Sequence, residues 1–150
     1  MIFRGKYSFL SNFTFVPTGI RYNGLTFHTV ENAYQAAKCS NVTNMYQFTS
    51  IPPEQAKKLG RKISIRDDWD EVKLDIMKEL LLQKFACPSL AEQLIATGDG
   101  YIAEDNYWHD NYWGICNCPN CIDKFPFENQ NHLGKLLMEI RAKLSKGEKA

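Results

Sequence analysis

The sequence predicts an α+β fold in which helices dominate and the few strands lie near the N-terminus. Apolar residues recur at helical spacing in several segments between residues 29 and 144, and one short segment carries a hairpin signal. The 150 residues are enough to bury a core without disulfides. We therefore expect residues 1–150 to form a single compact domain, mainly helical with a small sheet near the N-terminus, and residues from about 145 to 150 to be a frayed tail.

The expected elements have recognisable start and stop signals. Asn23-Gly24 separates two strand-like runs and is the strongest hairpin signal in the chain. Thr29 is a good N-cap for the next helix, and Gly60 and Gly98 stop two later ones. In order, the expected elements are the hairpin 20–27 and the helices 29–38, 52 or 53–59, 68–85, 89–97 and 131–144, with 101–104 as a candidate strand.

Two helices show a clear apolar face at core spacing. In the helix 68–85 this face comprises Trp69, Val72, Ile76, Met77, Leu80 and Leu81. In the helix 131–144 it comprises Leu133, Leu136, Leu137, Ile140 and Leu144.

Composition excludes several classes of protein. The formal charge of +1 argues against a dominant electrostatic footprint for nucleic acid. No run approaches the roughly 18 apolar residues of a membrane span, and the first residues lack a signal-peptide pattern. Five cysteines in such a chain favour thiols or a metal over a disulfide framework. We expect a cytoplasmic protein.

The segment 29–38 contains the most informative polar pattern. Glu31, Gln35 and Lys38 lie at i, i+4 and i+7, so a helix would present all three on one face. A carboxylate, an amide and an amine on an otherwise small and apolar helix suggest a binding or catalytic site. Capping offers an alternative, because Glu31 in the first turn and Lys38 near the end both suit the helix dipole.

Further candidates lie in loops and at one helix start. The segment 99–113 is rich in aromatic and acidic residues, and we expect most of its rings to fill space in the core. Trp113-Gly114 differs, because glycine allows close approach of a ligand. Asn12 is either a turn former or a substrate contact. Asn131 is either an N-cap or part of an anion site at the helix N-terminus.

Cys116, Cys118 and Cys121 form a C-x-C-x-x-C cluster with metal-like spacing. A fourth ligand would complete a tetrahedral zinc site, and the candidates for it are Cys39, Cys87, His109 and His132. Three reduced thiols are the competing interpretation. A zinc ion here would be structural, because other residues supply the chemistry.

Several of these segments occur together, and in this order they resemble the YbiA-like family, also called the NADAR domain. The match covers nearly the whole chain. Its pieces are 9–13, 30–38, 66–70 with Lys73 and Met77, Lys84-Phe85, 97–99 with Glu104, 112–114, and 131–138 with Arg141. One departure concerns the Gly-rich stretch that the family usually has after the Trp-Gly pair. Here the cysteine cluster and residues 123–127 replace it, and this segment borders the expected pocket, where the substrate is selected.

The resemblance implies an N-glycosidase, which cleaves the bond between a ribose carbon and a base nitrogen. Family members act on ribosylamino-pyrimidine phosphates of the riboflavin pathway or remove ADP-ribose from guanine. Carried over, the catalytic residues are Glu31 and Lys38. The expected substrate-binding residues are Asn12, Phe13, Gln35, Glu104, Trp113, Gly114 and Asn131.

We expect no cofactor in catalysis, a small nucleotide-like substrate or an ADP-ribosylated nucleic-acid base as the partner, and no membrane. A non-catalytic reader of ADP-ribose or a nucleotide is the first alternative. A zinc-knuckle-like nucleic-acid contact that includes Lys124 is the second.

Overall fold

The computed structural model describes residues 3–121 and 129–148 of the chain. Its residue contacts group into two compact units, Asn12–Leu90 and Met1–Ser11 together with Ala91–Ala150. The expectation of a single domain stays a prediction. Residues 123–127, including Lys124, and the last two residues of the expected tail lie outside the described residues.

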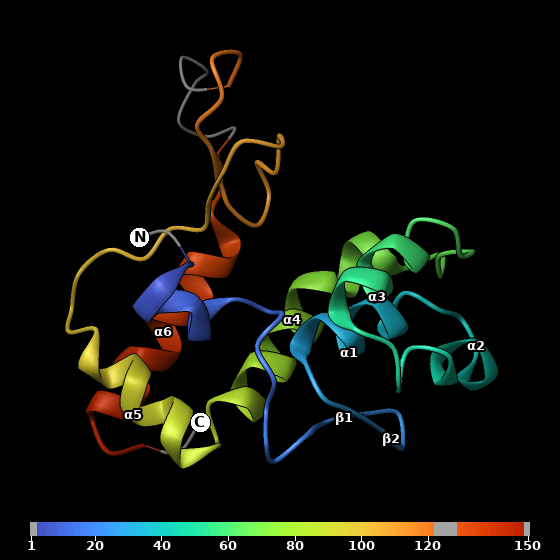
Figure 1. Ribbon diagram of the computed structural model, residues 1–150, viewed down its shortest axis with the longest axis horizontal. Helices are drawn as coiled ribbons and strands as arrows, with labels where there is room; N and C mark the ends of the chain where they lie inside the picture. Colours follow the sequence, from blue (N-terminus) through green and yellow to red (C-terminus); the bar gives the residue numbers. More distant parts are fainter. Residues whose placement is uncertain (1–2, 122–128, 149–150) are drawn as a thin grey trace. The chain divides into compact units, whose positions relative to one another are not determined.

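The unit of residues 12–90 combines a hairpin with helices (Figure 1). β1 (Ile20–Tyr22) and β2 (Leu25–Phe27) pair antiparallel, with Tyr22 opposite Leu25. Asn23 and Gly24 between them have φ angles of 50° and 82°, the left-handed conformation that a two-residue hairpin turn requires. The helices are α1 (Val30–Ala37), α2 (Val42–Tyr46), α3 (Pro53–Leu59) and α4 (Trp69–Lys84).

Helix α1 is the central element of this unit. It contacts α2, α3, α4 and both strands, and all eight of its residues are buried. Thr29 caps it, because the Thr29 hydroxyl accepts a hydrogen bond of 3.0 Å from the backbone N–H of Asn32. The Asn32 side chain donates to the carbonyls of Phe48 and Ile51 and so fixes the segment between α2 and α3 on α1. The polar residues of α1 are therefore enclosed by the structure around them.

The second unit contains a 3-10 helix, η1 (Gly5–Leu10), and the long helix α6 (His132–Ser145). α5 (Pro88–Ala96) begins in the first unit and continues into the second. β3 (Asp105–Asn106) and β4 (Ile115–Cys116) pair in parallel, with Asn106 opposite Cys116. The guanidinium of Arg141 on α6 donates to the hydroxyl of Thr97 at 2.9 Å and to the carbonyl of Gly100 at 2.5 Å. These bonds fix the end of α5 on α6.

The predicted fold class is confirmed, because helices dominate and the antiparallel hairpin lies near the N-terminus. The apolar faces predicted for α4 and α6 are buried, except that Val72 and Leu144 are half-buried. No helix in the described part of the chain has both the length and the apolar composition needed to cross a membrane.

The strand prediction for 101–104 is wrong, since the strand begins at Asp105 and pairs with β4, which was not predicted. The sequence analysis also missed α2 and η1. A two-residue strand shows no alternation and a five-residue helix shows too little of its period, so neither gives a reliable pattern.

Candidate active site

Glu31 and Gln35 form a hydrogen-bonded pair inside the first unit. Gln35 Nε2 donates to Glu31 Oε1 at 2.8 Å. Both side chains are buried, since Gln35 is 4% exposed and Glu31 is 7% exposed. Gln35 Oε1 is buried and accepts no hydrogen bond from the described residues. A buried acceptor without a donor is unfavourable unless a ligand supplies one. The pair thus presents an oriented carboxylate beside an acceptor that can bind a hydroxyl or an amine.

Lys38 is the C-cap residue of α1 and lies seven residues after Glu31, on the same side of the helix. Its Nζ lies 5.4 Å from the centre of the Tyr34 ring. Burial is the largest influence on the pKa of Lys38 and lowers it, while the nearby carboxylate of Glu31 acts in the opposite direction. Three further cations lower this pKa as well: Arg61, Lys57 and Lys73. Lys38 therefore gives up its proton more readily than an ordinary lysine.

Asn12 and Phe13 lie near this group. The carbonyl of Asn12 accepts a 3.0 Å hydrogen bond from the backbone N–H of Glu31, which ties the first turn of α1 to the segment before the hairpin. The Asn12 amide donates to the sulfur of Met77 at 3.7 Å, whereas Asn12 Oδ1 is buried without a donor among the described residues. The ring of Phe13 lies 5.9 Å from Lys57 Nζ. The structure thus brings together the predicted residues of this unit.

Gly60 is required here for its lack of a side chain. Its φ of −60° is ordinary for a helix end, but a Cβ at this position would overlap Gln35 Oε1. The end of α3 therefore packs directly on the side chain that orients Glu31. The sequence marks Gly60 only as a helix stop, so it does not reveal this contact.

We expect Gly60→Ala to lower the free energy of unfolding by about 1–3 kcal/mol, because the added methyl group has to displace Gln35 in a buried site. Urea unfolding followed by circular dichroism measures this change. Gly100→Ala is the matched control, because a Cβ there meets open space. Equal stability of the two variants would contradict the tight contact between Gly60 and Gln35.

Arg66 supports the C-terminal end of α1, a role that the sequence analysis did not assign. Its backbone N–H donates to the carbonyl of Lys38 at 2.8 Å, and its guanidinium donates to the carbonyl of Ala37. A cation at this end is favourable, because unpaired carbonyls carry negative charge there. The guanidinium also forms a two-pronged ion pair with Asp68, at 2.6 and 3.0 Å, and bonds the hydroxyl of Tyr22. Arg66 therefore fixes the backbone that carries Lys38.

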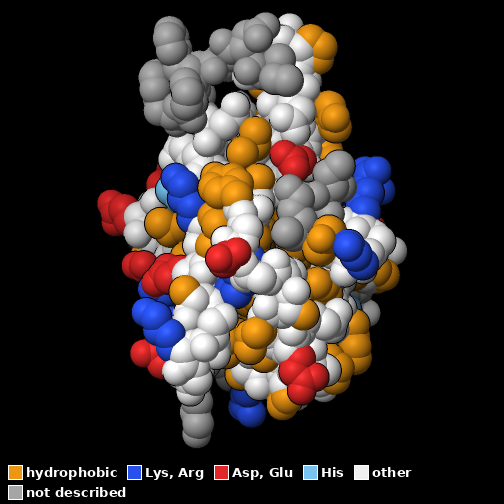
Figure 2. Space-filling view, turned by 90° about the vertical axis from the view of Figure 1, so that its left-hand side faces the viewer, with side chains coloured by type: hydrophobic (Ala, Val, Ile, Leu, Met, Phe, Trp, Pro, Cys, Tyr) orange, Lys and Arg blue, Asp and Glu red, His pale blue; other side chains and the backbone are white. Residues whose placement is uncertain are grey.

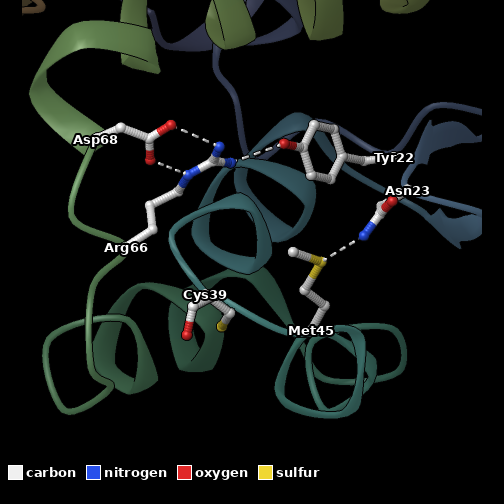
Figure 3. Close-up of a pocket in the computed structure, with 7 residues that line it drawn as sticks. Tyr22, Asn23, Cys39, Met45, Arg66 and Asp68 are labelled. Carbon is white, nitrogen blue, oxygen red and sulfur yellow. Dashed lines mark hydrogen bonds and ion pairs between the residues drawn. The ribbon is translucent and has the colours of Figure 1, made fainter.

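The same arginine lines a cavity of about 390 Å³ (Figure 3). In Figure 3 the guanidinium of Arg66 lies between Asp68 and Tyr22, while the amide of Asn23 points to the sulfur of Met45. The described lining of this cavity includes neither Glu31 nor Lys38 and consists of Tyr22, Asn23, Cys39, Ser40, Met45, Arg66 and Asp68.

A second group of predicted residues gathers at the start of α6, in the other unit. Asn131 Oδ1 accepts from the backbone N–H of Glu104 at 3.1 Å, and Asn131 Nδ2 donates to the carbonyl of Ile102 at 2.9 Å. The carbonyl of Gly114 accepts from the Asn131 N–H, and a Cβ at Gly114 would overlap the carbonyl of Glu104. Trp113 joins this group, because its carbonyl accepts from the N–H of Leu133.

The N-cap interpretation of Asn131 is wrong for its side chain. Asn131 precedes α6 in a left-handed conformation, with φ 49° and ψ 42°, and its side chain makes no cap hydrogen bond. That side chain instead hydrogen-bonds the segment 102–104. Its amide reaches backbone groups on both sides of Ala103, so it holds Glu104 in place.

The aromatic residues of the segment 99–113 do not all fill the core. Tyr101, Tyr107 and Trp108 are more than half exposed, which contradicts the core-packing expectation for them. Trp113 is half-buried and lies against Tyr112, with ring centres 4.8 Å apart at 83°. Backbone N–H groups of both residues donate to Asp110 Oδ1. Trp113 is therefore held by the contact of its ring with Tyr112 and by the hydrogen bond from its backbone N–H to Asp110.

Lys84 is a titratable group that the sequence analysis names in the family match but not among the candidate site residues. It is fully buried at the end of α4, and burial lowers its pKa to about 7. A buried lysine with such a pKa is a candidate functional group. The sequence contains a sign of this burial, because Lys84 lies seven residues after Met77 and therefore on the apolar face of the helix.

His109 and the three cysteines of the C-x-C-x-x-C cluster come together in the second unit. Their candidate ligand atoms all lie within 4.8 Å of one another, so the cluster is able to hold a metal ion. Of the four candidates for the fourth ligand, His109 is the one in this group. His132 instead bonds Gln130.

Comparison with known proteins places the chain in a family. A model of the NADAR domain matches residues 2–145, so the chain belongs to the NADAR family, and the predicted resemblance is confirmed. Together with the names of its relatives, this membership defines an enzyme of the N-glycosidase class.

The chain is 36% identical over 145 residues to N-glycosidase Npun_R5314 of Nostoc punctiforme, with 92% of this chain and 86% of the relative covered. It is 32% identical over 143 residues to N-glycosidase YbiA of Escherichia coli, covering 93% and 82%. The NMR structure of E. coli YbiA superposes with a TM-score of 0.77 at 28% identity, covering 98% of this chain and 85% of that one. A chloroplastic riboflavin biosynthesis protein, PYRR of Zea mays, is 30% identical over 133 residues, which are 79% of this chain but 20% of that protein.

Proposed function

We propose that this chain hydrolyses the N-glycosidic bond of a ribosylated or ADP-ribosylated base. The candidate substrates are a ribosylamino-pyrimidine phosphate of the riboflavin pathway and guanine that carries ADP-ribose. The observation that supports this most directly is the buried Glu31 carboxylate, oriented by Gln35 and interacting electrostatically with an amine whose pKa is lowered. The names of the relatives from N. punctiforme and E. coli support the reaction class.

Glu31 has the chemistry that this reaction needs. When the bond between C1′ and the base nitrogen breaks, the electron pair leaves with the base and positive charge develops on the ribose. A carboxylate stabilises that charge and accepts a proton from the attacking water, whose oxygen forms the new bond to C1′. The departing base takes up a proton, so the products are the free base and a ribose with a 1′-hydroxyl. We assign this role to Glu31.

Lys38 has two candidate roles. As a free amine it attacks C1′ while the bond between C1′ and the base nitrogen breaks, and the base leaves with the electron pair and takes up the proton that the amine loses. The sugar now bound to Lys38 opens its ring to a Schiff base, which water hydrolyses to the free amine and the ribose. As an ammonium it pairs with Glu31 or with a phosphate of the substrate. The cations that act on Lys38 come from α3, from the residue after its C-cap and from α4, and they favour an anionic substrate such as a nucleotide. Because its pKa is lowered, Lys38 becomes a free amine at a lower pH than an ordinary lysine does.

The remaining residues are proposed substrate contacts. Gln35 Oε1 and Asn12 Oδ1 are buried acceptors that suit ribose hydroxyls or base N–H groups. Phe13 and Trp113 offer ring faces to a base or sugar. We also propose Glu104, Gly114 and Asn131, which lie together at the start of α6, as substrate contacts.

We propose no cofactor in this reaction, a cytoplasmic location, and a structural role for a zinc ion at the cysteine cluster. A nucleic-acid contact at the cluster has less support. Described acidic and basic side chains are interspersed on the face shown in Figure 2, and the formal charge of the chain is +1.

A panel of N-ribosides tests the proposed function. The chain is incubated with ribosylamino-pyrimidine phosphates, ADP-ribosylated guanosine and ordinary nucleosides, and the released base is identified by its mass. We expect release from a member of the first two groups. Tight binding of ADP-ribose without release of any base would instead indicate the non-catalytic reader.

A further inference from the structure

We propose that His109, Cys116, Cys118 and Cys121 bind one structural Zn²⁺ ion and that this ion holds together the segment containing Trp113. This inference concerns the second unit and does not depend on the proposed hydrolysis. It follows from the distances among the four side chains, from the burial of the three cysteines and from the backbone that presents all four ligands.

The distances fit tetrahedral coordination. His109 Nδ1 lies 3.3 Å from Cys121 Sγ, 3.4 Å from Cys118 Sγ and 3.9 Å from Cys116 Sγ. Zinc binds sulfur at about 2.3 Å and imidazole nitrogen at about 2.0–2.1 Å, which places tetrahedral ligand atoms about 3.5–3.8 Å apart. The three nitrogen–sulfur distances lie around this value.

Hydrogen bonding alone does not account for this arrangement. One imidazole nitrogen carries either one hydrogen or one lone pair, so Nδ1 satisfies one sulfur at most, yet it faces three. All three thiols are buried, at 0%, 7% and 2% exposed for Cys116, Cys118 and Cys121, and they are not in disulfides. A divalent cation at their centre would satisfy all four atoms together, because each donates an electron pair to it.

The backbone is arranged to present these ligands. β3 and β4 place Cys116 opposite Asn106, and the side chain of Asn106 bonds the backbone of residues 108 and 110. This holds His109 in a left-handed conformation, with φ 69°, in the turn between them. The N–H of His109 donates to Cys116 Sγ at 3.3 Å, a contact that stabilises a thiolate. A turn closed by the N–H of Cys121 and the carbonyl of Cys118 brings the last two sulfurs to the same point.

The ligand set favours zinc in a structural role. Three thiolates and one imidazole are typical of closed zinc sites, in which protein side chains fill every position and leave none for water or substrate. Trp113 and Gly114 lie in the chain between His109 and Cys116, so the ion would connect both sides of this segment. Removing it would loosen the segment without removing any group that acts on a substrate.

Metal analysis of the purified chain of 150 residues tests the proposal. We expect about one zinc per chain by mass spectrometry after dialysis, and we expect Co²⁺ to replace it with the absorption bands of a tetrahedral cobalt–thiolate complex. Cys118→Ser should lower bound zinc about tenfold or more, whereas Cys87→Ser should retain it, because Cys87 bonds Ser89 and is not one of the four clustered ligand residues. A strong chelator should lower the melting temperature of the wild type but not of Cys118→Ser.

The wild-type measurement does not depend on the folding of any variant. A wild-type chain that stays metal-free in zinc-containing buffer and gives no cobalt–thiolate band would overturn the proposal. Full zinc occupancy in Cys118→Ser would overturn the ligand assignment. Base release by a zinc-free chain would leave the proposed function intact, so the two proposals can fail separately.

Discussion

The Glu31→Gln variant is expected to fold normally and to lose about 10²- to 10⁴-fold in kcat for base release, the usual contribution of a general base. Glutamine has the same shape, and its amide oxygen still accepts the hydrogen bond from Gln35. It neither stabilises a cationic sugar nor accepts a proton from water. Steady-state base release read by mass spectrometry gives kcat, and thermal unfolding shows whether the variant is folded.

Glu71→Gln is the matched control for this variant. Glu71 is exposed and lies in the first turn of α4, as Glu31 lies in the first turn of α1, so both carboxylates interact with a helix dipole. If Glu31 merely favours its helix, the two variants should behave alike. Turnover of Glu31→Gln within about twofold of the wild type would refute the assignment.

The Lys38→Met variant should lose any covalent sugar adduct and most of its turnover. Borohydride reduces a Schiff base, so treatment during turnover should add one reduced sugar to the wild-type chain, which intact-protein mass would reveal. Methionine keeps much of the apolar stem without the amine. Lys58→Met is the control, since Lys58 is exposed on α3.

The pH profile gives an independent measure of Lys38. An ordinary lysine has a pKa of 10.5, and burial lowers the pKa of Lys38 below that. The nucleophilic free amine is present above its pKa, so kcat/KM should rise with pH to a midpoint below 10.5. This rise should be absent in Lys38→Met. Full turnover without an adduct, together with an unchanged profile in the variant, would leave Lys38 with only an electrostatic role or none.

The polar residues of α1 show how much of the candidate site a local sequence pattern can predict. Spacing alone predicted that Glu31, Gln35 and Lys38 share a face, and the 2.8 Å bond between Gln35 and Glu31 agrees with this. Helical periodicity is a strong signal, because apolar burial enforces it along the whole segment. The sequence could not distinguish this group from capping residues, because burial and the cations around Lys38 depend on segments distant in the chain.

Other features escaped prediction for the same reason. Gly60 contacts Gln35, and Arg66 bonds the end of α1, yet each lies more than 20 residues away from its partner in the sequence. Asn131 has the residue type of an N-cap, but its side-chain amide hydrogen-bonds the segment 102–104 instead of the first turn of α6. Among the candidates for the fourth ligand of the cysteine cluster, only the folded chain selects His109.

A crystal structure of Glu31→Gln with a bound N-riboside tests the central claim most directly. The assignment predicts that the anomeric carbon lies within about 4 Å of the amide at position 31, with the amine of Lys38 on the same side of the sugar. A riboside whose C1′ lies about 10 Å or more from both groups, for example in the cavity beside Arg66, would contradict it.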